Sequence, residues 1–93
     1  MDTISGLLKT GAKIVDVRTP AEYAEGHVEE SVNIPLSQLA DHIKELRKMS
    51  GIIVCCASGI RSHKAANLLK GHGIECKDGG SWMNLNYLTT INS

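Results

Sequence analysis

The stretch IIVCCASGIRSHKAANLL, residues 52–69, combines a strand, a loop and a helix in direct succession. Residues 52–56 form the most strand-like run in the chain, because β-branched residues lead up to two adjacent cysteines. Apolar residues recur at helical spacing after Arg61 or Ser62. We therefore predict a buried strand, a short loop over residues 57–62 and a helix.

Strand-like and helix-like segments alternate along the rest of the chain. β-Branched or apolar runs predict strands at 12–18, 31–35 and 74–78, and helical spacing with capping residues predicts helices at 3–10, 20–25, 38–49 and 82–88. A turn is expected at Gly79-Gly80. This alternation is typical of βαβ units, so we expect an α/β fold in a single domain, 1–93. The mostly parallel sheet of about four to five strands would be flanked by helices on both faces.

The bulk composition narrows the function classes. Ten basic residues balance ten acidic ones, so no net charge would attract nucleic acid or an anionic membrane. No run of about 20 apolar residues predicts a membrane span, and no signal-peptide core is visible, so we expect a cytoplasmic protein. Three cysteines do not indicate a disulfide framework. Adjacent Cα atoms also lie closer, at about 3.8 Å, than ordinary disulfides require, so Cys55 and Cys56 are interpreted as free thiols.

The loop after Cys56 can carry chemistry at the thiol. A chain that turns from strand to helix can direct several backbone N–H groups at one point, and such a nest binds anions. Gly59 permits the backbone angles that this requires, and the guanidinium of Arg61 would favour a thiolate. We predict Cys56 as the nucleophile, with an anion-binding loop made of Ala57, Ser58, Gly59, Ile60, Arg61 and Ser62.

Strand alternation separates the two adjacent thiols. Neighbouring side chains in a strand point to opposite faces, so only one cysteine can face the loop. Cys56 begins the loop, and Cys55 is expected to pack against a helix on the other face.

Asp16 and Arg18 end another strand and are possible residues of the site mouth, although mutual pairing is the favoured interpretation. No metal is expected, because the spacing of Cys55, Cys56, Cys76, His63 and His72 fits no zinc pattern. Cys76 is interpreted as a strand residue near the surface, and a resolving thiol remains the alternative. His63 and His72 are expected at the surface.

Three segments resemble the single-domain rhodanese family. The loop CASGIRS, residues 56–62, resembles its active-site loop, and DVRTPAEYAEGHVEESVNIP, residues 16–35, resembles its upstream signature. DGGSW, residues 78–82, resembles the glycine pair and tryptophan that close the domain. The resemblance implies the rhodanese fold and a sulfurtransferase that needs no cofactor. Cys56 would take a sulfane sulfur from a small anionic donor such as thiosulfate and pass it to a thiol, cyanide or protein acceptor.

The chain departs from the family pattern at three places. Glu30 stands where many relatives have glycine, little sequence precedes Thr3 to form the usual first edge strand, and the spacing from the glycine pair to Trp82 is short. Glu22, Tyr23 and His27 are interpreted as scaffold residues for capping, packing and turns, and Trp82 as a core or rim aromatic.

Two other functions remain open. A phosphatase or arsenate reductase uses a Cys-x5-Arg loop, which the chain matches from Cys55 to Arg61, but the glycine then lies one position too far along. Counted from Cys56, the glycine fits and the loop is one residue shorter, which favours a sulfur atom over a tetrahedral phosphate. A non-catalytic rhodanese-like interaction or sulfur-relay module is the second alternative.

Overall fold

Four parallel strands form a single sheet in the computed structural model, which describes residues 3–91. The strand order is β2-β1-β3-β4, and all three neighbouring pairs are parallel. The strands are β1 (Lys13–Asp16), β2 (Val32–Asn33), β3 (Ile52–Cys56) and β4 (Lys77–Ser81). The predicted α/β class with a parallel sheet is confirmed.

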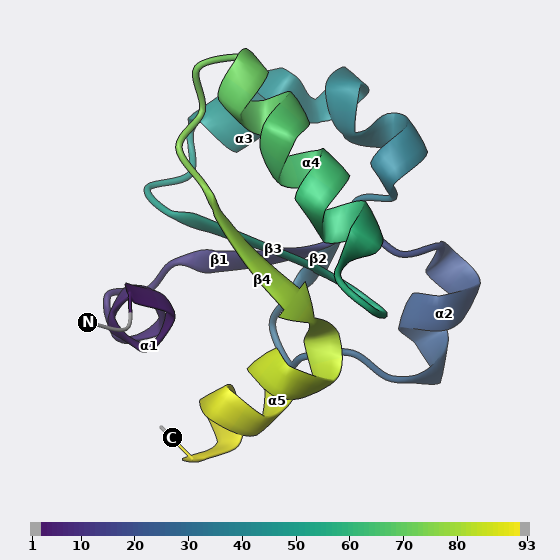
Figure 1. Cartoon of the computed structure of the whole chain (residues 1–93), viewed down its shortest axis with the longest axis vertical. Coiled ribbons are helices and arrows are strands. Elements are labelled where there is room, and N and C mark those ends of the chain that lie inside the picture. Colours follow the sequence, from purple (N-terminus) through teal and green to yellow (C-terminus); the bar gives the residue numbers. More distant parts are fainter. Residues whose placement is uncertain (1–2, 92–93) are drawn as a thin grey trace.

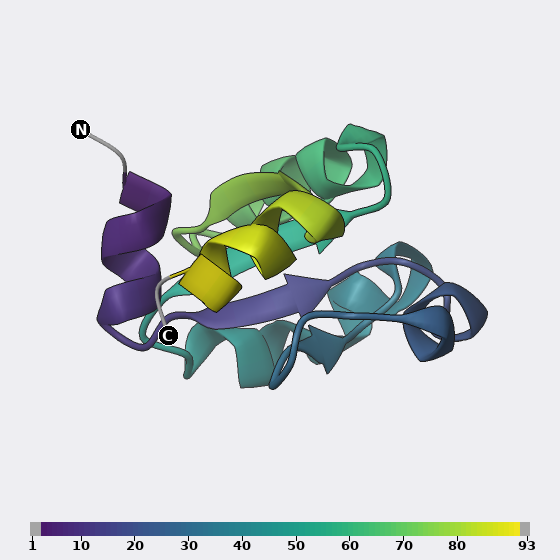
Figure 2. The ribbon, with the colours of Figure 1, turned by 90° about the horizontal axis from the view of Figure 1, so that it is seen from below.

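Helices cover both faces of the sheet (Figure 1). The 3-10 helix η1 (Leu36–His42), α3 (Ile43–Arg47) and α4 (Ile60–Gly71) pack on one face, and α1 (Thr3–Lys9) and α5 (Trp82–Ile91) pack on the other. Figure 2 shows α2 (Pro20–Glu25) beside the carboxyl ends of the strands, with α1 at the opposite end. Within residues 3–91, no helix is both long enough and apolar enough to cross a membrane.

The central strand β3 divides the core into two clusters. Ile52, Val54 and Cys56 join the cluster beneath η1, α3 and α4, whereas Ile53 and Cys55 join the cluster beneath α1 and α5. All five side chains are buried, because β3 is covered on both faces. The alternation predicted for the two cysteines is therefore confirmed.

Three details of the sequence-based expectation are wrong. The strand predicted at 74–78 begins only at Lys77 and continues to Ser81. Residues 38–49 do not form one helix capped by Ser37: the chain leaves Pro35 in a 3-10 turn, closed by a hydrogen bond from the Gln38 amide to the Pro35 carbonyl (2.8 Å), and becomes α-helical only at Ile43. Gly79 and Gly80 are not a separate turn but continue β4, whose pairing with β3 shifts register there.

Local signals set the remaining boundaries. Thr19 and Glu22 form the expected capping box at α2. The hydroxyl of Ser81 accepts the Met83 amide at the start of α5, as expected for a cap. The described residues begin at Thr3, the first residue of α1, so the expectation about an edge strand before Thr3 lies outside them.

Candidate active site

Cys56 ends β3 with its sulfur inside a loop of backbone amides. The amides of Gly59 and Ser62 donate hydrogen bonds to its Sγ at 3.0 and 3.3 Å. The residue is fully buried in the cluster beneath α4. Two residues of the predicted loop 57–62 thus direct their amides at the sulfur, and α4 begins between them at Ile60.

The nest favours the thiolate. Burial by itself would raise the pKa of Cys56, but the amides of Ser62, Gly59 and Ser58, together with the nearby Ser62 hydroxyl, outweigh it. The pKa of this thiol therefore lies below its ordinary value. A thiol with a lowered pKa presents more of its nucleophilic form at neutral pH.

Gly59 gives the loop its shape. Its φ is +102°, a left-handed value at which a side chain would be strained, and it precedes the first residue of α4. A β-carbon at this position would lie 3.8 Å from the Gly80 Cα, so the loop also approaches β4 closely. Ala57, Ser58 and Ile60 are exposed around the rim, and the Ile60 residue is 67% exposed.

Arg61 lies at the rim and is already engaged. Its Nη1 and Nη2 donate to Oε1 and Oε2 of Glu22 at 2.7 and 2.9 Å, a bidentate pair between residues that are each about one-third exposed. Hydrogen bonding to Arg61, together with the Thr19 amide, lowers the pKa of Glu22 to about 2. The guanidinium of Arg61 is therefore at the rim of the loop, as expected, but Glu22 holds it. The sequence predicted Glu22 only as a scaffold residue that caps a helix.

Asp16 and Arg18 pair with each other beneath the site, as the favoured interpretation predicted. Arg18 Nη2 lies 2.8 Å from Asp16 Oδ2, and both residues are buried. Arg18 also donates to the Gly26 carbonyl at 2.7 Å and lies 4.7 Å from the centre of the Trp82 ring. The pair ties the end of β1 to α2 and to the start of α5.

Cys55 has the opposite environment to Cys56. It pairs with Asp16 across β1 and β3, and its side chain is fully buried in the cluster beneath α5. Burial, and after it the Asp16 carboxylate, raises the pKa of Cys55 far above the ordinary value. This thiol stays protonated and has no access to the loop.

The sequence of this chain is similar to those of known proteins. Residues 2–84 match the rhodanese-like domain. The chain belongs to the rhodanese-like domain family. It is 35% identical over 77 residues to the thiosulfate sulfurtransferase GlpE of Pseudomonas syringae, covering 80% of this chain and 73% of that protein. It is 39% identical over 62 residues to the uncharacterized protein YqhL of Bacillus subtilis, covering 67% of this chain and 49% of that protein. The chain thus spans about half the length of YqhL.

A solved structure supports the same assignment. The rhodanese-like domain protein from Staphylococcus aureus superimposes with a TM-score of 0.75 at 28% identity, covering 88% of this chain and 86% of that one. The fold of this rhodanese-like domain is therefore the family fold.

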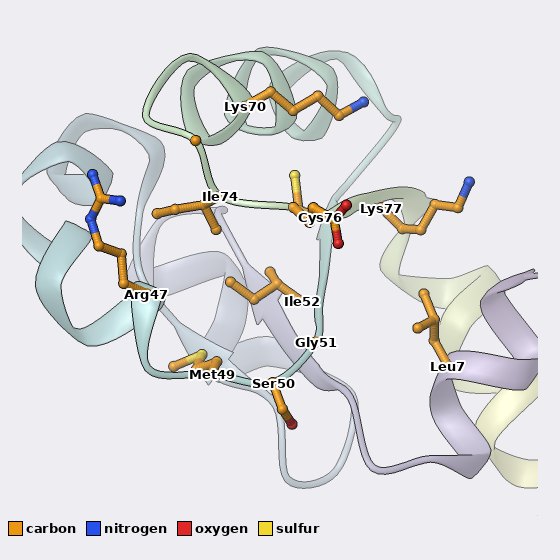
Figure 3. Close-up of a pocket in the computed structure, with 12 residues that line it drawn as sticks. Leu7, Arg47, Met49, Ser50, Gly51, Ile52, Lys70, Ile74, Cys76 and Lys77 are labelled. Carbon is orange, nitrogen blue, oxygen red and sulfur yellow. The ribbon is translucent and has the colours of Figure 1, made fainter.

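One cavity of this rhodanese-like domain lies away from the thiol loop. It has a volume of about 1070 Å³ and opens at the amino ends of β3 and β4, where Ile52, Ile74 and Cys76 line it (Figure 3). Ile52 is the first residue of β3 and Cys56 the last, so the cavity is about 13 Å from the sulfur along the strand. This cavity is therefore separate from the reacting sulfur of Cys56.

Within the described residues, the side chains of Cys76, His63 and His72 form no hydrogen bond with the Cys56 sulfur. Cys76 precedes β4 rather than lying in a strand, is half-buried, and has a pKa raised mainly by burial. His63 and His72 are exposed, as expected. Within residues 3–91, no three His, Cys, Asp or Glu side chains are close enough together to hold a metal ion.

Two residues near the nest were missed by sequence reasoning. Glu22 was interpreted only as a helix cap, yet it also holds Arg61. Asp78, in β4, accepts a hydrogen bond from the Ser62 hydroxyl at 2.7 Å. The only sequence signal for Asp78 was its place in the DGGSW segment, which resembles the family's closing motif.

Proposed function

We propose that this chain is a sulfurtransferase that carries a sulfane sulfur as a persulfide on Cys56. The observation that carries the proposal is the pair of amide hydrogen bonds from Gly59 and Ser62 to a thiol whose pKa is lowered. The same amides would stabilise the negative charge on the outer sulfur of a persulfide. Membership of the rhodanese-like family and similarity to a protein named thiosulfate sulfurtransferase support it.

The proposed reaction has two displacement steps at sulfur. The Cys56 thiolate attacks the outer sulfur of thiosulfate, a new S–S bond forms, and the old S–S bond breaks with its electron pair leaving on sulfite. Cyanide or an acceptor thiolate then attacks the outer sulfur of the persulfide. Its bond to Cys56 breaks, and the electron pair returns to Cys56 as thiolate. No external oxidant or reductant is required.

The rim of the loop suits an anionic donor and a larger acceptor. The guanidinium of Arg61 lies at the mouth but is paired with Glu22, so the loop amides are the groups that would receive a small anionic donor. Ile60 offers an exposed apolar side chain beside it, which a protein acceptor could cover. We therefore include a protein among the possible acceptors, alongside small thiols and cyanide.

The phosphatase alternative is disfavoured by the partners of two residues. Its loop count begins at Cys55, whose thiol faces the other side of the sheet and remains protonated. Its arginine would be Arg61, whose two Nη atoms are occupied by Glu22 rather than directed at a tetrahedral oxyanion. We expect no turnover of an aryl phosphate comparable to thiosulfate:cyanide transfer.

The decisive experiment measures the intact mass of the protein after incubation with thiosulfate. We expect a gain of one sulfur atom that is lost again on addition of cyanide. Cys56→Ser should abolish the gain, whereas Cys55→Ser and Cys76→Ser, as matched controls, should retain it. A sulfur adduct that survives in Cys56→Ser and disappears in Cys55→Ser would show that Cys55 carries the sulfur, and the proposal for Cys56 would be wrong. The absence of an adduct with several donors would instead favour an interaction module.

A further inference from the structure

The Asp78 carboxylate joins the active-site loop to the last strand. Its Oδ1 accepts hydrogen bonds from the Ser62 hydroxyl at 2.7 Å and from the Gly80 amide at 3.0 Å. Ser62 is fully buried at the start of α4, and its amide is one of the two that donate to the Cys56 sulfur. One oxygen of Asp78 therefore fastens the residue that contacts the sulfur to the β4 backbone.

The Ser62 hydroxyl has one proton and more than one acceptor. It lies 3.1 Å from the Gly59 carbonyl and 2.7 Å from the Asp78 carboxylate. The charged and closer acceptor holds the proton more strongly. Ser62 is thus anchored to β4 through its side chain while its backbone N–H faces the thiol.

We propose that Asp78 is a positioning residue for the Cys56 thiol, acting through Ser62 to hold the amide nest closed around the sulfur. The proposal rests on the proposed function for its biological meaning, since a persulfide would occupy the same nest. Asp78 bonds to Ser62 and Gly80 and not to the sulfur, so its role differs from that of the loop amides.

Two effects of Asp78 on the thiol have opposite signs, which makes the proposal testable. A negative charge near a thiolate raises the pKa of that thiol, so loss of the charge alone would lower it. Loss of the clamp would instead loosen the Ser62 amide and raise the pKa, because a hydrogen bond to the thiolate is weakened. The direction of the change therefore distinguishes positioning from simple electrostatics.

The experiment follows the rate of Cys56 alkylation by iodoacetamide against pH, in a Cys76→Ser background. For Asp78→Ala, we expect the midpoint to rise by about one pH unit, so that the rate below the midpoint falls about tenfold. Asp78→Asn keeps an oxygen acceptor without the charge, so its midpoint should lie at or slightly below that of the parent. A lower or unchanged midpoint in Asp78→Ala, or equal shifts in Asp78→Ala and Asp78→Asn, would overturn the proposal.

Ser62→Ala provides a second route if Asp78→Ala folds poorly. Ser62→Ala alone should raise the midpoint, because it releases the same anchor without changing Asp78. Where the double variant with Asp78→Ala folds, its midpoint should rise no further, and an additive rise would contradict the clamp. His63→Ala is the matched control: the exposed imidazole lies 3.6 Å from the other carboxylate oxygen, and its removal should leave the midpoint unchanged. Alkylation needs no sulfur donor, so this test can fail or succeed independently of persulfide formation.

Discussion

Cys55 and Cys56 are neighbours in β3, but they belong to different faces of the sheet and to different chemistry. Cys56 faces α4 and receives amide hydrogen bonds, whereas Cys55 faces α5 and lies beside the Asp16–Arg18 pair. The same side chain thus has its pKa lowered in one position and raised in the next. The difference shows that the polar groups directed at a buried thiol, more than burial itself, decide whether it can react.

The largest expected effect concerns the sheet face that holds Cys55, here called the Cys55 face. It tests how much the buried Asp16–Arg18 pair beside Cys55 contributes to the free energy of unfolding. Asp16→Ala leaves the buried Arg18 guanidinium without its carboxylate and should cost about 3–5 kcal/mol of unfolding free energy. Denaturant unfolding measures this cost. The double variant Asp16→Ala/Arg18→Met removes both charges and should recover part of the loss, since no unpaired charge remains buried. A double variant less stable than Asp16→Ala would show that Arg18 matters more for its contacts with Gly26 and Trp82.

Two glycines provide a matched pair of substitutions on the two faces. A β-carbon at Gly79 would lie 2.7 Å from Ile53 Cγ2 and 2.9 Å from Leu85 Cδ1, so Gly79→Ala overpacks the Cys55 face and should cost about 1–3 kcal/mol. Gly59→Ala meets no such crowding but must adopt a φ of +102°, at a similar cost of about 1–3 kcal/mol. Unfolding should therefore not separate the two variants.

Thiol reactivity should separate them. Gly59 donates directly to the Cys56 sulfur, so we expect Gly59→Ala to slow alkylation of Cys56 at neutral pH, whereas a folded Gly79→Ala should alkylate at the parent rate. Equal slowing in both variants would mean that the nest depends on general packing rather than on the loop conformation.

The pH dependence of stability should show opposite slopes for the two cysteines. Cys56 ionises in the folded state below its unfolded pKa of about 8.5, so it adds stability as pH rises towards that value, and the gain is lost as pH falls through the folded pKa. Cys55 stays protonated in the folded state, so it removes stability above about pH 8.5, by up to about 1.4 kcal/mol per pH unit.

Alanine variants isolate each slope. Unfolding free energy measured from pH 6 to 10 should decline less steeply above about pH 8.5 in Cys55→Ala than in the parent. Cys56→Ala should lack the rise below that value. Identical slopes in both variants would show that the two environments do not differ as described.

The sequence predicted this contrast because its causes are local. Strand alternation placed Cys55 and Cys56 on opposite faces, and Gly59 indicated the loop conformation. The partners that refine the site are distant in the chain: Ser62 and Asp78 are 16 residues apart, and Glu22 and Arg61 are 39 apart. Their contacts depend on strand order and on how the loop meets β4 and α2, which no local pattern contains.

The same reasoning explains the error at β4. Glycine pairs usually mark turns, but Gly79 lies in a strand. The position requires glycine because any side chain there would collide with Ile53 and Leu85. Glu30 shows a related limit: it adopts a left-handed φ of +68°, at the position where the family resemblance leads one to expect glycine. Such tertiary demands override local propensity and are visible only once the neighbours are placed.

The smallest expected effect concerns the rim of the Cys56 face. Glu22→Gln keeps a side chain able to complete the capping box at α2 but removes the charge that holds Arg61. The released guanidinium can then attract an anionic donor, so we expect the KM for thiosulfate to fall about two- to threefold with kcat unchanged, in keeping with the small energy of a surface pair. The effect should shrink at high salt.

Glu25→Gln, an exposed glutamate on the same helix, is the matched control and should change the KM little at any salt concentration. Acid unfolding gives a second measurement. The Glu22 pKa of about 2 in the folded state means that its contribution to stability is present above its ordinary value and is lost as pH falls towards 2. Glu22→Gln should lack that loss. A rise in KM would indicate that Glu22 orients Arg61 for the donor, and the ion pair would then belong to the working site rather than restrain it.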